Sequence, residues 1–279
     1  MIKSFFLFFL LTSTPLIGFS YIPRVSTVLE KTTSNNGTGV YQIEQEVIFS
    51  AGTGEPLVIK ETWLVENDSN MRLIVTAGRE LKDRLKWVID YNSGARAMIT
   101  PQGRVAKKTS PDFIEKWFHF RKPESLGNAI EASGILPSSS INRRIQRSGK
   151  DFIYPTDENV RLARIGGTVS YAYGKPSPIE GSPFAGLWIE QDMFVIRKIR
   201  LPSGAEVSAD NYSAFSKGLN FPLNRTVRWE NNAIQIQTLS VSNTSVKSIN
   251  SPLETSQLIE LPSDLPEKLI IDEFYLRFR

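Results

Sequence analysis

Short runs of alternating apolar and polar residues recur along most of the chain. In "VYQIEQEVIF" (residues 40–49) and "FPLNRTVRW" (residues 221–229), apolar side chains occupy nearly every second position. In the second run only Arg225 interrupts the alternation. Successive side chains of a β-strand point to opposite faces of a sheet. Each run therefore predicts a strand with one buried face and one exposed face.

The runs are numerous enough for one large antiparallel sheet. Residues 41–100 predict a meander with a hairpin tip at 92–94, and strands resume near residue 161. Two strands are expected about a tight turn at Gln191–Asp192, and residues 268–278 predict a last strand. The total is about ten to twelve strands, and a strongly twisted sheet of that size tends to curl.

Helical patterns interrupt the strands in two places. Residues 22–33 predict a short helix before the first strand. A longer helical insertion is expected at about 110–150, where Ser110 suits an N-cap and Pro111 suits the first helical position. Two further short helices are expected within that insertion. The fold class is therefore mainly β, of the α+β type.

The first twenty residues have the pattern of a signal peptide. Lys3 precedes an apolar run over residues 5–11, and the small residues Gly18 and Ser20 fit a signal-peptidase site. We expect cleavage after Ser20, an exported protein in the periplasm, and one domain over residues 21–279. The alternative is that the apolar run is retained as an anchor, although it is short for a membrane span.

Composition excludes several kinds of chemistry. The chain has 279 residues, a net charge of +4, no cysteine and a single histidine, His119. Basic residues do not cluster into the stripe that nucleic-acid binding needs. Without cysteine there is no disulfide, thiolate metal site or cysteine nucleophile. No nucleophile-elbow or phosphate-binding motif is present. We expect no cofactor, no metal and no nucleic acid, and binding in place of catalysis.

The residues that stand out are aromatic. Eight of them fall on the inner face of the predicted sheet and three on the first helix of the insertion. These candidates for an apolar ligand site are Tyr41, Phe49, Trp63, Trp87, Tyr171, Tyr173, Phe194 and Trp229 on the sheet, and Phe113, Trp117 and Phe120 on the helix. Two interpretations remain: a closed core, or a curved sheet around an apolar cavity with the helices as a lid.

The order of these elements resembles the LolA/LolB superfamily of bacterial lipoprotein carriers. The segments that carry the resemblance are "GVYQIEQEVIFSAGTGEPLVIKETWLVENDSNMRLIV" and "FVIRKIRLPSGAEVSADNYSAFSKGLNFPLNRTVRWENNAIQIQTLSV". The resemblance implies an incomplete antiparallel β-barrel whose concave face holds the acyl chains of a lipid or lipoprotein. It implies no cofactor, no catalysis, and a transport partner in the cell envelope.

The sequence departs from that family at two points. Carriers of the LolA type have a basic residue before a proline after the second strand, where this chain reads "VENDSN". The absence of cysteine also excludes the membrane-tethered LolB type, which is lipid-modified at an N-terminal cysteine.

Two alternatives come from other classes of protein. The C-terminal "IDEFYLRFR" alternates at Phe274, Leu276 and Phe278 like the last strand of an outer-membrane β-barrel protein. However, several strands would carry charges on the lipid-facing side, and a helical insertion interrupts the set. The second alternative is an exported enzyme of unrecognised class, which would need convergent carboxylates in a solvent-filled pocket.

Overall fold

The fold is described from a computed structural model. The described residues are 22–50, 56–77, 86–100, 103–143, 146–148, 151–153, 157–176, 184–251 and 265–279. The predicted signal peptide at residues 1–20 lies outside them. Among the described residues, no helix has both the length and the apolar character needed to cross a membrane.

Strands dominate the chain, and short helices lie between and after them. The strands are β1 Tyr41–Phe49, β2 Leu57–Asn67, β3 Asn70–Ala77, β4 Lys86–Asn92, β5 Ala95–Thr100, β6 Gly103–Lys108, β7 Gln146–Ser148, β8 Asp151–Ile153, β9 Val160–Ile165, β10 Thr168–Tyr173, β11 Gly186–Glu190, β12 Ile196–Arg200, β13 Glu206–Ala214, β14 Asn220–Trp229 and β15 Asn232–Asn243. The helices are α1 Val25–Ser34, α2 Pro123–Ala132, α3 Ser138–Ile141, α4 Val246–Ile249 and α5 Lys268–Arg277, with short 3-10 helices η2 Glu115–Phe118 and η3 Ser216–Gly218.

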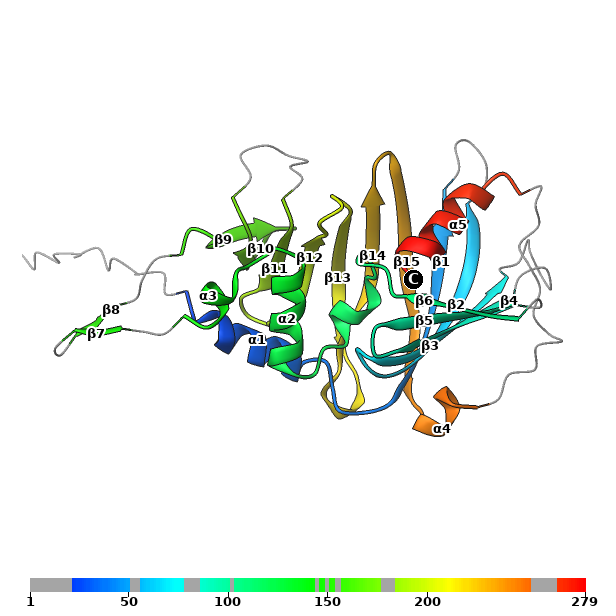
Figure 1. Ribbon diagram of the computed structural model, residues 1–279, viewed down its shortest axis with the longest axis horizontal. Helices are drawn as coiled ribbons and strands as arrows, with labels where there is room; N and C mark the ends of the chain where they lie inside the picture. Colours follow the sequence, from blue (N-terminus) through cyan, green and yellow to red (C-terminus); the bar gives the residue numbers. More distant parts are fainter. Residues whose placement is uncertain are drawn as a thin grey trace, which may run out of the picture.

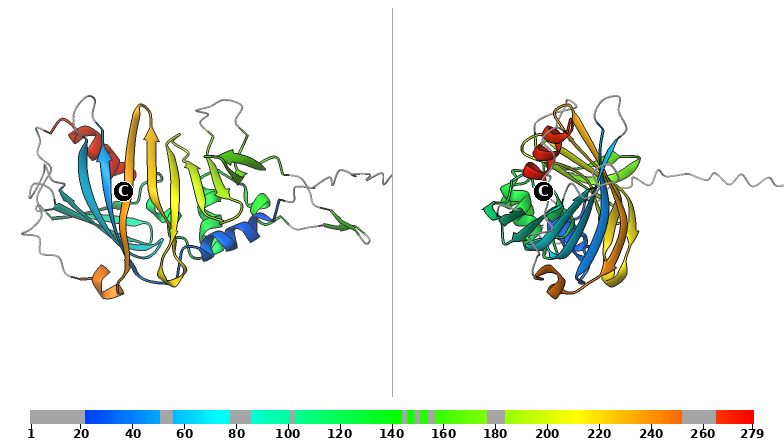
Figure 2. Two further views of the ribbon diagram at one scale, coloured as in Figure 1. Left: turned by 180° about the vertical axis from the view of Figure 1, so that it is seen from behind. Right: turned by 90° about the vertical axis from the view of Figure 1, so that its right-hand side faces the viewer.

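Thirteen of the strands form one antiparallel sheet, in the order β6-β5-β4-β3-β2-β1-β15-β14-β13-β12-β11-β10-β9. The terminal strands β6 and β9 do not pair with each other, so the sheet is curved but not closed into a barrel (Figure 2). The predicted fold class, a mainly β protein with a single curved antiparallel sheet, is confirmed. One strand of the first meander, β6, was not predicted because all six of its residues are exposed and carry no apolar alternation.

Helices α2 and α5 lie on the concave side of the sheet, as the end view in Figure 2 shows, whereas α4 lies below the ends of the strands. Helices α1 and α2 pack together beneath the half that contains β9–β12, whereas α5 lies beside β1 and β15 at the other half (Figure 1). The helical insertion at 110–150 is thus present, with η2, α2 and α3 as its helices and the small β7–β8 hairpin after them.

Two sequence predictions were wrong in their secondary structure. Residues 268–277 form helix α5 and not a last strand. The side chains that α5 and its end bury are Ile271, Phe274, Tyr275 and Phe278, which are spaced three or four residues apart. This spacing gives a helix one apolar face, whereas Leu276, which the strand pattern required, is 60% exposed.

The second error concerns the start of the insertion. Residues 110–122 do not form an α-helix, and only Glu115–Phe118 form a 3-10 turn. Long-range contacts hold this segment: the Ile114 N–H donates to the Phe278 carbonyl oxygen, and Arg277 Nε lies 2.6 Å from Asp112 Oδ2. The aromatic side chains of the segment are buried as expected, but along an irregular chain.

Two turns depend on glycine in the left-handed backbone region. Ser93 and Gly94 connect β4 to β5 with φ values of 48° and 84°, which is the geometry of a two-residue hairpin turn. Gly37, before β1, has φ 65° and faces the Tyr41 hydroxyl so closely that a Cβ there would lie 2.1 Å from that oxygen. Only glycine therefore fits position 37.

Candidate functional site

The largest aromatic group among the described residues lies between α5 and the sheet. Phe274 of α5 contacts the rings of Phe49 and Trp229, with centroids 5.6 and 6.4 Å apart. Tyr275 packs edge-on against Trp87 at 5.2 Å, and Phe278 lies 4.9 Å from Trp229. Three of the predicted residues, from strands β1, β4 and β14, therefore meet under one helix.

A second aromatic group lies between the sheet and the segment before η2. Trp63 of β2 stacks on Tyr91 of β4 with centroids 5.6 Å apart, and Tyr91 stacks on Phe113 at 4.5 Å with an interplanar angle of 9°. Trp117 and Phe120 contact each other edge-on at 5.9 Å. All of these side chains are buried. The concave face is thus filled here by residues of the insertion.

The remaining candidates lie elsewhere. Tyr171 contacts Phe194 at 6.1 Å near α1, where the Lys31 ammonium sits over the Phe194 ring. Phe194 lies in the β11–β12 turn and not in a strand. Tyr173 is buried in β10, and the Tyr41 hydroxyl hydrogen-bonds to backbone groups of Gly39 and Ser216. The eleven residues are therefore distributed over several parts of the interior and do not converge on one site.

Several polar atoms of the aromatic side chains in this interior have no hydrogen-bond partner among the described residues. They include the indole N–H groups of Trp87, Trp117 and Trp229 and the hydroxyls of Tyr91 and Tyr173. Buried Trp and Tyr usually place their polar atoms against a partner. For Tyr91 and Tyr173, burial raises the pKa well above its usual value, so both hydroxyls keep their protons.

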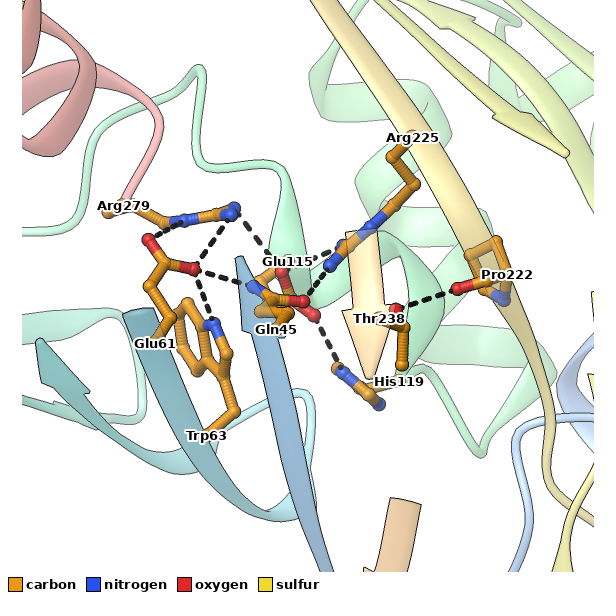
Figure 3. Close-up of polar contacts among 9 residues, drawn as sticks. All are labelled: Gln45, Glu61, Trp63, Glu115, His119, Pro222, Arg225, Thr238 and Arg279. Carbon is orange, nitrogen blue, oxygen red and sulfur yellow. Dashed lines mark hydrogen bonds and ion pairs between the residues drawn. The ribbon is translucent and has the colours of Figure 1, made fainter. Parts of the chain in front are cut away.

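A buried polar network crosses the same face. Arg225 donates from Nη1 to Glu115 Oε2 at 2.8 Å and from Nη2 to Gln45 Oε1 (Figure 3). Gln45 in turn donates to Glu61, which also accepts from Trp63 Nε1 at 3.1 Å. Strands β14, β1 and β2 are thereby tied to one another and to η2 through side chains that are all buried.

Arg279 completes the network from the chain segment after α5. Its Nε and Nη2 donate to the two oxygens of Glu61, both at 3.0 Å, and its Nη1 donates to Glu115 Oε2 at 3.2 Å. The two glutamates and two arginines have no exposed side-chain surface. Their charges balance, so the network adds no net charge to the interior.

His119 is attached to this network through Glu115. Its Nε2 lies 3.2 Å from Glu115 Oε1, and its ring stacks on Phe221 at 5.5 Å. Burial lowers the pKa of His119 below its usual value, although the hydrogen bond to Glu115 opposes this. Burial alone would raise the pKa of Glu115, but Arg225, the His119 hydrogen bond and Arg279 together hold it well below the usual range.

The network was not predicted, although the sequence contained a signal for it. Gln45, Glu61 and Arg225 each occupy an inward position in an apolar alternation, where a polar side chain is unusual. In the sheet, Gln45 lies opposite both Glu61 and Thr238. In the part of the chain that the structure describes, no group of His, Asp and Glu side chains is arranged to hold a metal ion.

Comparison with known proteins shows the fold. No family model matches the sequence, and no curated protein does so. A solved LolA superfamily protein, NE2245 from Nitrosomonas europaea, matches with a TM-score of 0.50 at 12% identity, over 81% of this chain and 96% of that one. An outer membrane lipoprotein-sorting protein domain from Vibrio parahaemolyticus gives a TM-score of 0.48 at 9% identity, over 81% and 96% of the two chains. A DUF1329 family protein from Desulfovibrio piger gives 0.46 at 9% identity, over 85% and 100%.

These likenesses concern the fold because the sequence identities are low. The resemblance seen in the sequence is confirmed at that level: the chain has the fold of LolA superfamily proteins.

Proposed function

We propose that this protein is an exported carrier or binder of an acylated, hydrophobic ligand, such as a lipid or a lipoprotein. The ligand would lie between the curved sheet and the segments that cover its concave face. In this proposal the protein works by binding and release in the periplasm, not by catalysis, and it exchanges its ligand with a partner in the envelope.

The main support for the proposal is that two separate elements, the sheet and helix α5, each supply one side of the aromatic interior. One side belongs to the sheet, through Phe49, Trp87 and Trp229, and the other side belongs to α5, through Phe274 and Tyr275. An aromatic surface divided between a sheet and a separate helix can exchange ring–ring contacts for contacts with an acyl chain. Burial of ten methylenes contributes about 8 kcal/mol of gross hydrophobic free energy, before ordering costs.

The unpartnered polar tips also support this proposal. The indole N–H groups of Trp117 and Trp229 and the Tyr173 hydroxyl are buried donors with no acceptor among the described residues. An acylated ligand brings ester or amide carbonyl oxygens, which accept hydrogen bonds. Apolar walls with a few polar groups are typical of small-molecule sites.

Native mass spectrometry provides the direct test. The full chain is exported in a Gram-negative host and recovered by osmotic shock without detergent. We expect a mass increment from bound acyl compounds that organic extraction removes. A dansyl-labelled undecanoic acid is then titrated into the extracted protein, and its fluorescence should rise on binding.

A matched pair of variants in α5 locates the ligand. Phe274 is fully buried against the sheet, whereas Leu269 on the same helix is 84% exposed. Phe274→Ala should change the probe dissociation constant several-fold, and Leu269→Ala should leave it unchanged. The absence of both a bound compound and probe binding in the wild-type protein would contradict the proposed function.

The domain organisation is part of the same proposal. We infer that residues 1–20 form a signal peptide and that residues 21–279 form one LolA-like half-barrel domain with its helical insertion at 110–150. N-terminal sequencing of the shock fluid should give Tyr21 as the first residue. Retention of the protein in carbonate-washed membranes would instead indicate an anchor.

A further inference from the structure

A groove of about 310 Å³ opens between α5 and the outer strands β4, β5 and β6. Its apolar walls come from both sides. The side chains that line it include Trp87, Arg96, Met98, Val105, Lys107 and Leu276. Val105 and Leu276 are 53% and 60% exposed, so apolar surface continues to the mouth of the groove. This shape and lining suit an alkyl chain.

Two positively charged side chains lie directly opposite each other in the groove. Arg96 of β5 and Lys107 of β6 are cross-strand partners, which places their side chains on the same face of the sheet. Like charges in that position destabilise a sheet. An anion bound between them would offset this repulsion. Among the described residues, no carboxylate forms an ion pair with Arg96 or Lys107. Asp272 also lines the groove, but it pairs with Lys268 of its own helix.

Arg96 is buried without a charge partner of its own. It is 7% exposed, and it donates from Nη1 to the Leu276 carbonyl oxygen at 3.1 Å and from Nη2 to the Tyr275 carbonyl oxygen at 2.7 Å. Its Nε finds no acceptor in the described part of the chain, and neither does the indole N–H of Trp87, which lines the same groove. A buried guanidinium is costly unless an anion compensates it.

We propose that this groove binds a single-chain amphiphile with an anionic head group, of which a fatty-acid carboxylate is the simplest. The carboxylate oxygens accept from Arg96 Nε and lie beside Lys107, and the alkyl chain follows Met98, Val105 and Leu276 toward Trp87, which lies four residues along β4 from the partner of Arg96. This inference rests on the proposed function and specifies the charge of the ligand's head group and the place where it binds.

The head group is tested with ligands of one chain length. Laurate, dodecyl phosphate and the neutral dodecanol are titrated into the extracted protein by isothermal calorimetry below their micellar concentrations. We expect laurate to bind about tenfold more tightly than dodecanol, since one favourable charge interaction near a protein surface has about that value. Tighter binding of dodecyl phosphate than of laurate would assign the site to a phosphate head group.

Two charge reversals on one strand provide the matched control. Lys107→Glu places a negative charge at the groove, and Lys108→Glu makes the same change on the opposite face of β6, outside the groove lining. Both side chains are exposed, so both variants should fold. Lys107→Glu should weaken laurate binding about tenfold and leave dodecanol binding unchanged. Lys108→Glu should leave both unchanged.

The position is tested by fluorescence quenching. A bromine atom quenches tryptophan only at short range, so 11-bromoundecanoate in the groove should quench Trp87. Replacement of Trp87 by Phe should remove most of the quenching, whereas replacement of Trp188, which lies on β11, should not. Equal laurate and dodecanol affinities that Lys107→Glu does not alter would overturn the head-group site while leaving the carrier function intact. No binding of any of the probes would overturn both.

Discussion

Arg225 and Glu115 form an ion pair of 2.8 Å between two side chains that are both fully buried. The pair connects β14 to η2, which are 110 residues apart in the sequence. A buried ion pair adds little net stability over a well-packed apolar pair, but the loss of one partner leaves an uncompensated charge. The pair is therefore one of the contacts that position the insertion on the sheet.

Removal of one partner should be strongly destabilising. We expect Arg225→Met to lower the free energy of unfolding by about 3–5 kcal/mol, because Glu115 keeps only Arg279 as a close cation. The measurement is urea unfolding followed by circular dichroism. Lys268→Met breaks the partly exposed pair with Asp272 and serves as the control, with an expected loss below about 1 kcal/mol. Similar small losses in both variants would contradict the role of the network.

Stability should fall as the pH is lowered, first through His119. The folded-state pKa of His119 is lowered from 6.5, so below pH 6.5 the unfolded chain binds more protons than the folded chain. The pKa of Glu115 is lowered from 4.5, and its contribution is lost as the pH falls below 4.5. Both effects lower the free energy of unfolding in acid.

His119→Gln separates the two effects. His119 is the sole histidine of the sequence. The variant should therefore abolish the fall in the free energy of unfolding just below pH 6.5 and keep the fall below pH 4.5. Urea unfolding at a series of pH values between 7.5 and 4 measures both. A wild-type stability that stays constant between pH 6.5 and 5 would be incompatible with a neutral buried histidine.

Trp117 should contribute more to the free energy of unfolding through the volume that its ring fills than through its indole N–H. Its side chain is fully buried, and its indole N–H has no partner among the described residues. Trp117→Ala should cost about 3–5 kcal/mol in thermal or urea unfolding. Trp117→Phe should cost much less, because it retains most of the ring and removes an unpartnered donor. Weaker dansyl-probe binding by Trp117→Ala would further support the carrier function, whereas equal costs for the two variants would show that the volume is unimportant.

Two glycines with similar backbone angles should respond differently to alanine. At Gly94 a Cβ meets no atom within 4 Å, so Gly94→Ala should cost only the left-handed backbone penalty of about 1–2 kcal/mol. At Gly37 the Cβ would collide with the Tyr41 hydroxyl, which accepts a hydrogen bond from the Gly39 N–H and donates one to the Ser216 carbonyl oxygen. Gly37→Ala should therefore cost clearly more than Gly94→Ala in urea unfolding. An equal cost would show that Tyr41 moves away freely.

Local alternation was sufficient to predict most of the sheet. The inward positions of Trp63, Trp87 and Trp229 follow from period two alone, and the structure places all three in contact with residues of α5, of the segment before η2, or of the chain end that follows α5. The sheet of thirteen strands exceeds the expected number chiefly because β6 is exposed throughout and the β9–β10 hairpin was not resolved into two strands.

The sequence was less informative where distant segments meet. Phe274 and Phe278 fit both a strand and a helix pattern, and the contacts with Phe49 and Trp229 favour the helix. Arg225 was identified as an interruption, but its partners Gln45 and Glu115 lie more than a hundred residues away. Periodicity indicates which face a residue occupies, and it does not indicate which distant residue will lie opposite it.

The strand order also has a consequence for how the chain folds. Every neighbouring pair in the sheet is consecutive in the sequence except β1 and β15, whose registers join Val47 to Ile236 and Phe49 to Ile234. Local hairpins form quickly, whereas pairing across a long loop is slow because the entropy of closing the loop must be lost first. The two meanders, β1–β6 and β9–β15, can thus assemble independently. The seam between β1 and β15 would form last, and it would limit the rate at which the curved sheet is completed.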